Sequence, residues 1–260
     1  MGLKICNLFS GSTGNSTYVA SANTQLLIDA GVSAGRIEKA VKVLRGDCQN
    51  MAVLVTHRHS DHIAGLSVLA GKYPAMRVYA HERVAPDLIK NGLPQSRVQT
   101  FADADFYVGD ITVSPLRLSH DVFCVGFGLH CGGKKITYVT DTGFLPDNVL
   151  RFASDSDLVL IESNHSPELL MANRSYSYPL KQRILSMRGH LSNEDCAAAV
   201  TALARNGVKH FILAHLSKEN NYPELAYSVC RAALARAGLT NDVGLEVACA
   251  DRLGGLMEIV

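Results

Sequence analysis

The feature that most constrains this sequence is a short segment that holds three histidines and an aspartate. The segment, His57-Arg58-His59-Ser60-Asp61-His62, directly follows an apolar run at residues 51–56 and precedes a helical pattern of apolar residues. A run of that length, rich in β-branched residues, predicts a buried strand. The strand therefore delivers four side chains that can bind metal into one loop at its carboxyl end.

These four side chains predict a metal site rather than a chance surface cluster. Neutral imidazole and carboxylate are ligands that borderline divalent metals accept, and a set without thiolate suits zinc, manganese or iron in a hydrolytic role. A single catalytic ion needs only three protein ligands and a water molecule. Because this loop alone offers four ligands, and more follow downstream, the sequence predicts two divalent ions, zinc or manganese.

The downstream candidates are His120, Asp141 and His215, each of which lies just after an apolar run of the strand type. Strand ends gather in space even when they are far apart in the sequence, so we expect these residues to join the site. Taken alone, a single histidine or a Thr-Asp-Thr turn is more typical of a structural role. Their combination with the histidine segment is what makes them candidates.

The organisation of the chain predicts one domain, residues 1–260, with two sheets and helices outside them. Both halves begin with strands and continue with strand and helix pairs, and no low-complexity linker or short repeat divides them. The predicted strands are residues 3–9, 16–20, 24–29, 51–56, 78–80, 111–118, 125–131, 135–140, 157–162 and 211–214. The predicted helices are residues 37–44, 63–73, 83–91, 192–206 and 222–237.

Composition favours a cytoplasmic protein. The net charge is +1, so no overall field points to nucleic acid or to a membrane, and such a partner must be argued locally. The seven cysteines are odd in number and lack C-x-x-C spacing, which is typical of reduced thiols in a core. No apolar run approaches the roughly 20 residues that span a bilayer, and we expect neither a leader peptide nor a membrane partner.

The ligand pattern resembles that of the metallo-β-lactamase superfamily along the whole chain. The matching segments are Thr56-His57-x-His59-x-Asp61-His62, His120, Val139-Thr140-Asp141-Thr142-Gly143 and Leu213-Ala214-His215-Leu216-Ser217. The resemblance implies an α/β fold, the αββα sandwich of two mixed sheets with helices on the outer faces. It also implies that His57, His59 and His120 hold a first ion, that Asp61, His62 and His215 hold a second, and that Asp141 bridges them.

Three further segments resemble the YycJ/WalJ branch of that superfamily, which stands near RNase Z. They are Leu8-Phe9-Ser10-Gly11-Ser12-x-Gly14-Asn15-Ser16, Glu162-Ser163-Asn164-His165 and Gly189-His190-Leu191-Ser192-Asn193. The branch is linked to exonuclease activity on DNA. We therefore expect Asn15, Asn164 and His165 to contribute to substrate binding.

His190 is the residue that would discriminate a phosphodiesterase from other hydrolases of this pattern. Its position, between the bridging aspartate and the last ligand, resembles that of a histidine in RNase Z. Such a residue would donate a proton or a hydrogen bond to a phosphate oxygen or to the leaving 3′-oxygen. The alternative is a structural histidine in the loop before a helix.

A basic strip precedes His190. Between Leu169 and Asn193 there is no acidic residue. The same stretch contains four cations and two tyrosines, in the order Arg174, Tyr176, Tyr178, Lys181, Arg183 and Arg188. Such a strip could neutralise phosphates and stack bases, and we expect Lys181 and Arg183 to bind substrate. The alternative is a solvated basic loop.

These features predict a dinuclear metal-dependent phosphodiester hydrolase that acts on nucleic acid, and the resemblance to the YycJ/WalJ branch implies an exonuclease that acts on DNA rather than RNA. In this hypothesis Asp61 orients and helps deprotonate the attacking water, and His190 assists the leaving group. The alternative is a thioesterase of the hydroxyacylglutathione hydrolase kind, or a small-molecule cyclic phosphodiesterase, because either could use the same ligands. A redox or purely metal-binding scaffold is disfavoured by the presence of Asp61.

Overall fold

The computed structural model describes residues 2–259 and contains two seven-stranded sheets. The strands of the first sheet, in spatial order, are β14 (Met257–Ile259), β1 (Leu3–Phe9), β2 (Ser16–Ala20), β3 (Gln25–Ile28), β4 (Ala52–Val55), β5 (Arg77–His81) and β6 (Val98–Phe101). Those of the second are β13 (Gly244–Val247), β12 (His210–Ala214), β11 (Leu158–Glu162), β10 (Lys134–Val139), β9 (Val125–Cys131), β8 (Ile111–Arg117) and β7 (Phe106–Val108).

The first sheet changes from antiparallel to parallel at β3. Strands β14, β1, β2 and β3 pair antiparallel, with short loops from β1 to β2 and from β2 to β3, whereas β3, β4, β5 and β6 pair parallel. Parallel neighbours need a crossover. Helices α1 (Ala34–Val43), α3 (Leu66–Lys72) and α4 (Ala85–Lys90) supply the three crossovers. The carboxyl ends of β3 and β4 therefore lie at the same edge, where the histidine segment begins.

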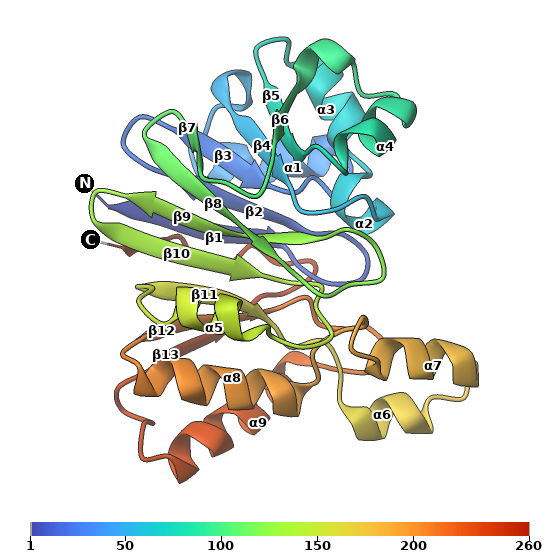
Figure 1. Ribbon diagram of the computed structural model, residues 1–260, viewed down its shortest axis with the longest axis vertical. Coiled ribbons are helices and arrows are strands. Elements are labelled where there is room, and N and C mark those ends of the chain that lie inside the picture. The colour runs from blue at the N-terminus through green and yellow to red at the C-terminus, as the bar shows by residue number, and fades with distance from the viewer. Residues whose placement is uncertain (1, 260) are drawn as a thin grey trace. The chain divides into compact units, whose positions relative to one another are not determined.

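The second sheet is parallel from β10 to β13 and antiparallel between β7 and β8. Helix α8 (Asn193–Arg205) leads into β12, and α9 (Pro223–Arg236) connects β12 to β13. Both helices lie along one side of strands β11 to β13 in Figure 1. Their apolar stripes pack with those strands in a buried cluster that includes Val200, Phe211 and Leu234. This packing holds the strands whose carboxyl ends carry Glu162 and His215.

The chain divides into two compact units. One comprises residues 2–115, 129–134 and 250–259, and the other comprises residues 116–128 and 135–249. Strands β8, β9 and β10 contribute residues to both units, so the boundary does not follow a linker. The expectation of a single domain over residues 1–260 remains a prediction.

The predicted strands are all present, and for β1, β2 and β9 the observed bounds agree with the prediction residue by residue. The helix predicted at residues 63–73 is wrong as one element. It is divided into α2 (Ser60–Ile63) and α3, because the backbone N–H of Gly65 donates to the carbonyl of Ala30 at 2.9 Å instead of continuing the helix. The helix predicted at residues 192–206 is present as α8, and the Ser192 hydroxyl caps its start by accepting from the N–H of Asp195.

Several short elements were missed by the sequence analysis. They are β6, β7, β13, β14, α5 (Asp147–Ala153), α6 (Pro167–Ala172) and α7 (Tyr178–Leu185). The four strands lie at or beside sheet edges and have three or four residues each, too few to show a period. Helices α6 and α7 bury only Leu170 and Ile184, so they lack the apolar stripe by which a helix is recognised.

Two expectations about the chain's environment can be compared with the structure. All seven cysteines are free thiols, and five of them are buried. Among residues 2–259, no helix combines the length and the apolar character that crossing a membrane requires.

Candidate metal centre

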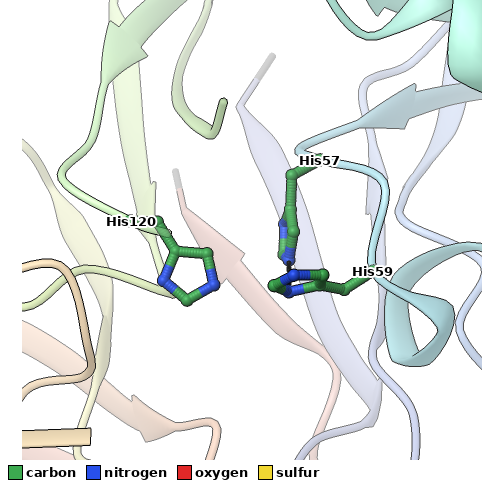
Figure 2. Close-up of side chains that lie close together, drawn as sticks. All are labelled: His57, His59 and His120. Carbon is green, nitrogen blue, oxygen red and sulfur yellow. Dashed lines mark hydrogen bonds between the residues drawn. The ribbon is translucent and has the colours of Figure 1, made fainter. Parts of the chain in front are cut away.

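Strand β4 carries His57 to the carboxyl edge of the first sheet, and a tight loop places His59 beside it. Nε2 of His57 and Nδ1 of His59 lie 3.0 Å apart, with the rings edge to face. Figure 2 shows these two imidazoles together on the loop after β4, and it also draws His120, from the loop after β8. Two nitrogens bound to one zinc at about 2.1 Å are separated by about 3.0–3.4 Å. The spacing of this pair therefore fits two ligands of one ion.

Asp29 fixes the ring orientation of the histidines in this unit. The carboxylate is fully buried at the end of β3 and accepts hydrogen bonds from Nδ1 of His62 at 2.7 Å and from the Thr56 hydroxyl at 2.8 Å. Since the Thr56 hydroxyl donates to Asp29, it accepts from Nδ1 of His57 at 3.0 Å. Both imidazoles thus carry their proton on Nδ1 and present Nε2, the arrangement typical of metal-bound histidine.

Asn15 joins the turn after β1 to the loop that carries Asp61. Its backbone N–H donates to the carbonyl of Asp61 at 2.8 Å, and its side-chain amide lies 3.0 Å from Nε2 of His62 and 3.3 Å from Oδ2 of Asp61. A Cβ on neighbouring Gly31 would lie 1.7 Å from the same carbonyl, so only glycine permits this approach. Asn15 is 2% exposed and contacts candidate ligands. Its expected role in substrate binding remains a prediction.

In the second unit, a single carboxylate links two of the predicted site residues. Oε1 of Glu162 accepts from Nδ1 of His215 and from Nδ1 of His190, both at 2.7 Å. Oε2 accepts from the backbone N–H groups of Thr142, at 2.9 Å, and Leu191, at 3.2 Å. Ligand atoms of Asp141, Glu162, His190 and His215 all lie within 4.8 Å of one another. The structure therefore brings three predicted residues together around one that was not predicted.

The charge of Glu162 is stabilised by these donors. Burial alone would raise the pKa of this fully buried carboxyl, but the charges and hydrogen bonds of His190 and His215 outweigh burial and hold the pKa below its ordinary value. Because His215 donates through Nδ1, its Nε2 is the nitrogen that would bind a metal. His190 also donates through Nδ1, and its side chain is 19% exposed. Nε2 of His190 is thus the one that can act on a substrate.

Backbone strain marks both parts of the candidate centre. Within residues 2–259, four non-glycine residues have a positive φ in the left-handed region, and three of them are Asp29 (62°), Asp141 (63°) and His215 (57°). Such conformations cost about 1 kcal/mol or more and persist where the surrounding structure enforces them. They occur here at one positioning carboxylate and at two predicted metal ligands.

His120 is held by the segment that leads from α7 to His190. Nδ1 of His120 donates to the carbonyl of Gly189 at 3.2 Å, and the Arg188 guanidinium donates to the carbonyls of His120 and Asp121 at 3.1 and 3.0 Å. The carbonyl of Met187 accepts from the Ser119 hydroxyl at 2.7 Å. These contacts leave Nε2 of His120 as the ligand nitrogen, and they tie the position of His120 to the end of α7.

The two basic residues predicted to bind substrate lie on α7. The ammonium of Lys181 donates to the carbonyl of Met171 on α6 at 2.6 Å. The guanidinium of Arg183 lies 3.3 Å from Oδ2 of Asp121, while its side chain stays 61% exposed. Both therefore have structural contacts in addition to any role toward a substrate, and that role remains a prediction.

Asn164 and His165 are both buried in the second unit. The amide of Asn164 donates to the carbonyl of His215 at 2.8 Å, so it supports the backbone of a predicted ligand. His165 is 1% exposed, and desolvation lowers the pKa of its imidazole to about 4. The ring is therefore neutral at physiological pH. Their expected roles in substrate binding remain predictions, and the contact of Asn164 points to positioning.

Three positioning residues were not predicted from the sequence: Asp29, Glu162 as an acceptor, and Arg188 as a support for His120. Asp29 is the last residue of a predicted strand and lies two residues before Gly31. Glu162 is the last residue of another predicted strand, in a segment that resembles the YycJ/WalJ branch. An acid at the carboxyl end of an apolar strand was the available signal. No sequence signal distinguishes Arg188 from the other cations of the basic strip.

A family model described as the beta-lactamase superfamily domain matches residues 24–216. The chain therefore belongs to the β-lactamase superfamily. It is a metal-dependent hydrolase of that superfamily. The chain is 38% identical to exodeoxyribonuclease WalJ of Streptococcus pneumoniae over 255 residues, which cover 95% of this chain and 94% of that protein. It is 39% identical to exodeoxyribonuclease YycJ of Bacillus anthracis over 231 residues, which cover 87% of each.

A solved structure confirms the predicted fold. The metallo-β-lactamase fold protein YhfI from Bacillus subtilis superposes with a TM-score of 0.74 at 16% identity, covering all of both chains. The predicted fold class, an α/β structure with two mixed sheets and helices, is therefore correct, as is the predicted resemblance to the YycJ/WalJ branch. At that identity, the structural likeness supports the fold alone.

Replacing Glu162 with Gln tests its role as a positioning residue. A glutamine has one oxygen that accepts, so two of the four donors around it lose their acceptor. We expect the affinity for divalent metal to fall by about 10- to 100-fold, measured by competition with a chelator, because His215 is no longer oriented. We also expect the free energy of unfolding of the metal-free protein to fall by about 2 kcal/mol.

Glu168→Gln is the matched control, because it makes the same chemical change at an exposed position on α6. It should leave both quantities unchanged. Wild-type metal affinity in Glu162→Gln would contradict the positioning role.

Proposed function

We propose that this protein is a dinuclear phosphodiesterase that degrades DNA from an end. His57, His59 and His120 would hold one divalent ion, Asp61, His62 and His215 a second, and Asp141 would bridge them. The assignment rests on the family's ligand motif, which draws residues from both units, and zinc and manganese both suit the donors. The fixed tautomers support it, because His57, His62, His120 and His215 all use Nδ1 in hydrogen bonds.

Bound ions would lower the pKa of a coordinated water molecule and neutralise the charge that develops on the phosphate. The chain's own residues have the remaining tasks. Asp61, whose side chain is 24% exposed, would orient the water and accept its proton. As an imidazolium, with a proton on each ring nitrogen, His190 would donate the Nε2 proton to the leaving oxygen while Glu162 holds the ring through Nδ1.

The observation that carries a phosphodiester substrate is the shared carboxylate of Glu162. One buried acid orients both a predicted metal ligand, His215, and a partly exposed histidine that is not needed as a ligand. A general acid beside the metal site is useful when the leaving group is an alkoxide, which needs a proton to depart. The names of the two relatives favour DNA over RNA and an exonuclease mode. A DNA substrate also favours a cytoplasmic location.

To test the substrate class, metal-loaded protein is incubated with DNA, RNA, a glutathione thioester or bis-p-nitrophenyl phosphate, and hydrolysis of each is measured. We expect DNA to be degraded from its ends to mononucleotides, and we expect Asp141→Ala, which lacks the bridging ligand, to lose this activity. The variant also controls for contaminating nuclease. Rapid thioester hydrolysis without degradation of DNA would contradict the proposal and favour the thioesterase alternative.

Replacing His190 with Ala tests the general acid. We expect the metal content to stay at the wild-type level, because His190 is not among the proposed ligands. Cleavage of DNA should slow by about 10²- to 10⁴-fold. The loss should be much smaller for bis-p-nitrophenyl phosphate, since p-nitrophenolate departs without a proton. Metal analysis and kcat on both substrates are measured together, and equal losses on the two would remove His190 from the mechanism.

A further inference from the structure

Helices α6 and α7 expose an unusual amount of apolar surface. Of the twelve large apolar side chains that are exposed among the described residues, five lie on these helices or just after them: Leu169, Met171, Tyr178, Leu185 and Met187. Tyr178 and Met187 are 67% and 62% exposed. The two helices extend away from strands β11 to β13 of their unit (Figure 1). We call residues 167–188 the α6–α7 segment.

The same segment is strongly basic. It contains four cations and a single acid, Glu168, whereas the net charge of the whole chain is only +1. Arg174 and Arg183 are exposed, and the Lys181 ammonium donates from α7 to the carbonyl of Met171 on α6. Positive charge interleaved with exposed apolar side chains suits a polyanion that also carries flat apolar groups. An apolar protein partner would not require the charge.

The segment is continuous with the candidate centre of its own unit. Arg183 and Arg188 contact the loop that carries His120, and the chain then continues through Gly189 to His190. The rings of His120 and His190 have centroids 5.1 Å apart. A strand that lies along α7 would therefore reach the residues proposed to act on a phosphate.

We propose that the α6–α7 segment binds unpaired nucleotides of the substrate strand, with bases stacked on Tyr178 and neighbouring apolar side chains. This inference rests on the proposed nuclease function and adds that the bound end is single-stranded or frayed. In a duplex the bases are already stacked within the helix, so exposed apolar side chains gain nothing from them. Unpaired bases expose their faces, and stacking on an aromatic side chain is worth about 1–3 kcal/mol per base.

The test uses the full chain with its metal removed by a chelator, so that binding is measured without cleavage. The probes are a labelled short oligodeoxythymidylate, a blunt duplex, and the same duplex with a single-stranded overhang, at one salt concentration. We expect Tyr178→Ala to weaken binding of the single strand and the overhang by about 5- to 100-fold. Binding of the blunt duplex should change little.

Two variants serve as controls. Tyr178→Phe keeps the ring and should bind like the wild type. Tyr107→Ala removes a tyrosine that is 72% exposed on β7 and should also bind like the wild type. Unchanged binding of the single strand by Tyr178→Ala would overturn the proposal, as would an equal loss on the blunt duplex. A change in oligomeric state in Tyr178→Ala, measured by light scattering, would instead assign the segment to contacts between copies and would also overturn it.

The two proposals fail in different ways. If metal-loaded wild type degrades DNA while Tyr178→Ala binds every probe normally, the α6–α7 segment is rejected and the nuclease function stands. If the wild type binds single strands through Tyr178 but degrades no DNA, the nuclease function is rejected while the binding surface stands.

Discussion

Two fully buried carboxylates, Asp29 and Glu162, set the orientation of the candidate centre. Removing a charged carboxylate from water is costly unless hydrogen bonds replace its hydration. Asp29 accepts from Thr56 and His62, and Glu162 accepts from two imidazoles and two backbone N–H groups. The hydrogen bonds that replace the hydration of these carboxylates therefore come largely from the side chains that must be oriented at the centre. Each unit has its own carboxylate, so each part of the ligand set is oriented within its own fold.

Strand ends supply the frame for this arrangement. Parallel strands place successive loops at one edge of a sheet, which is why Asp29 after β3 can meet Thr56 and His62 after β4. In the second unit, β11 and β12 place Glu162 beside His215 in the same way. In the connection from β11 to β12, α8 buries an apolar stripe, while α6 and α7 bury little. A scaffold with stable strands thus carries a segment that is available to bind.

The ligand motif and the strands that deliver it could be predicted from the sequence, because both follow from local pattern. The apolar run at residues 51–56 and the ligands after it identify a site without knowledge of tertiary contacts. The roles of Asp29 and Glu162 could not be predicted, since nothing local shows that an acid after a strand becomes fully buried. Helices α6 and α7 were missed because their exposed faces remove the periodicity on which helix prediction depends. The division of the helix after His62 depended on a long-range hydrogen bond to Ala30.

We propose, as the central point, that the seven motif residues hold two metal ions. Anomalous diffraction from crystals of the intact protein loaded with zinc or with manganese measures this directly, because peaks locate each ion independently of activity. We predict two peaks about 3.5–4 Å apart, one among His57, His59 and His120 and the other among Asp61, His62 and His215, with Asp141 between them. A single peak, or two peaks that Asp141 does not contact, would contradict the dinuclear centre.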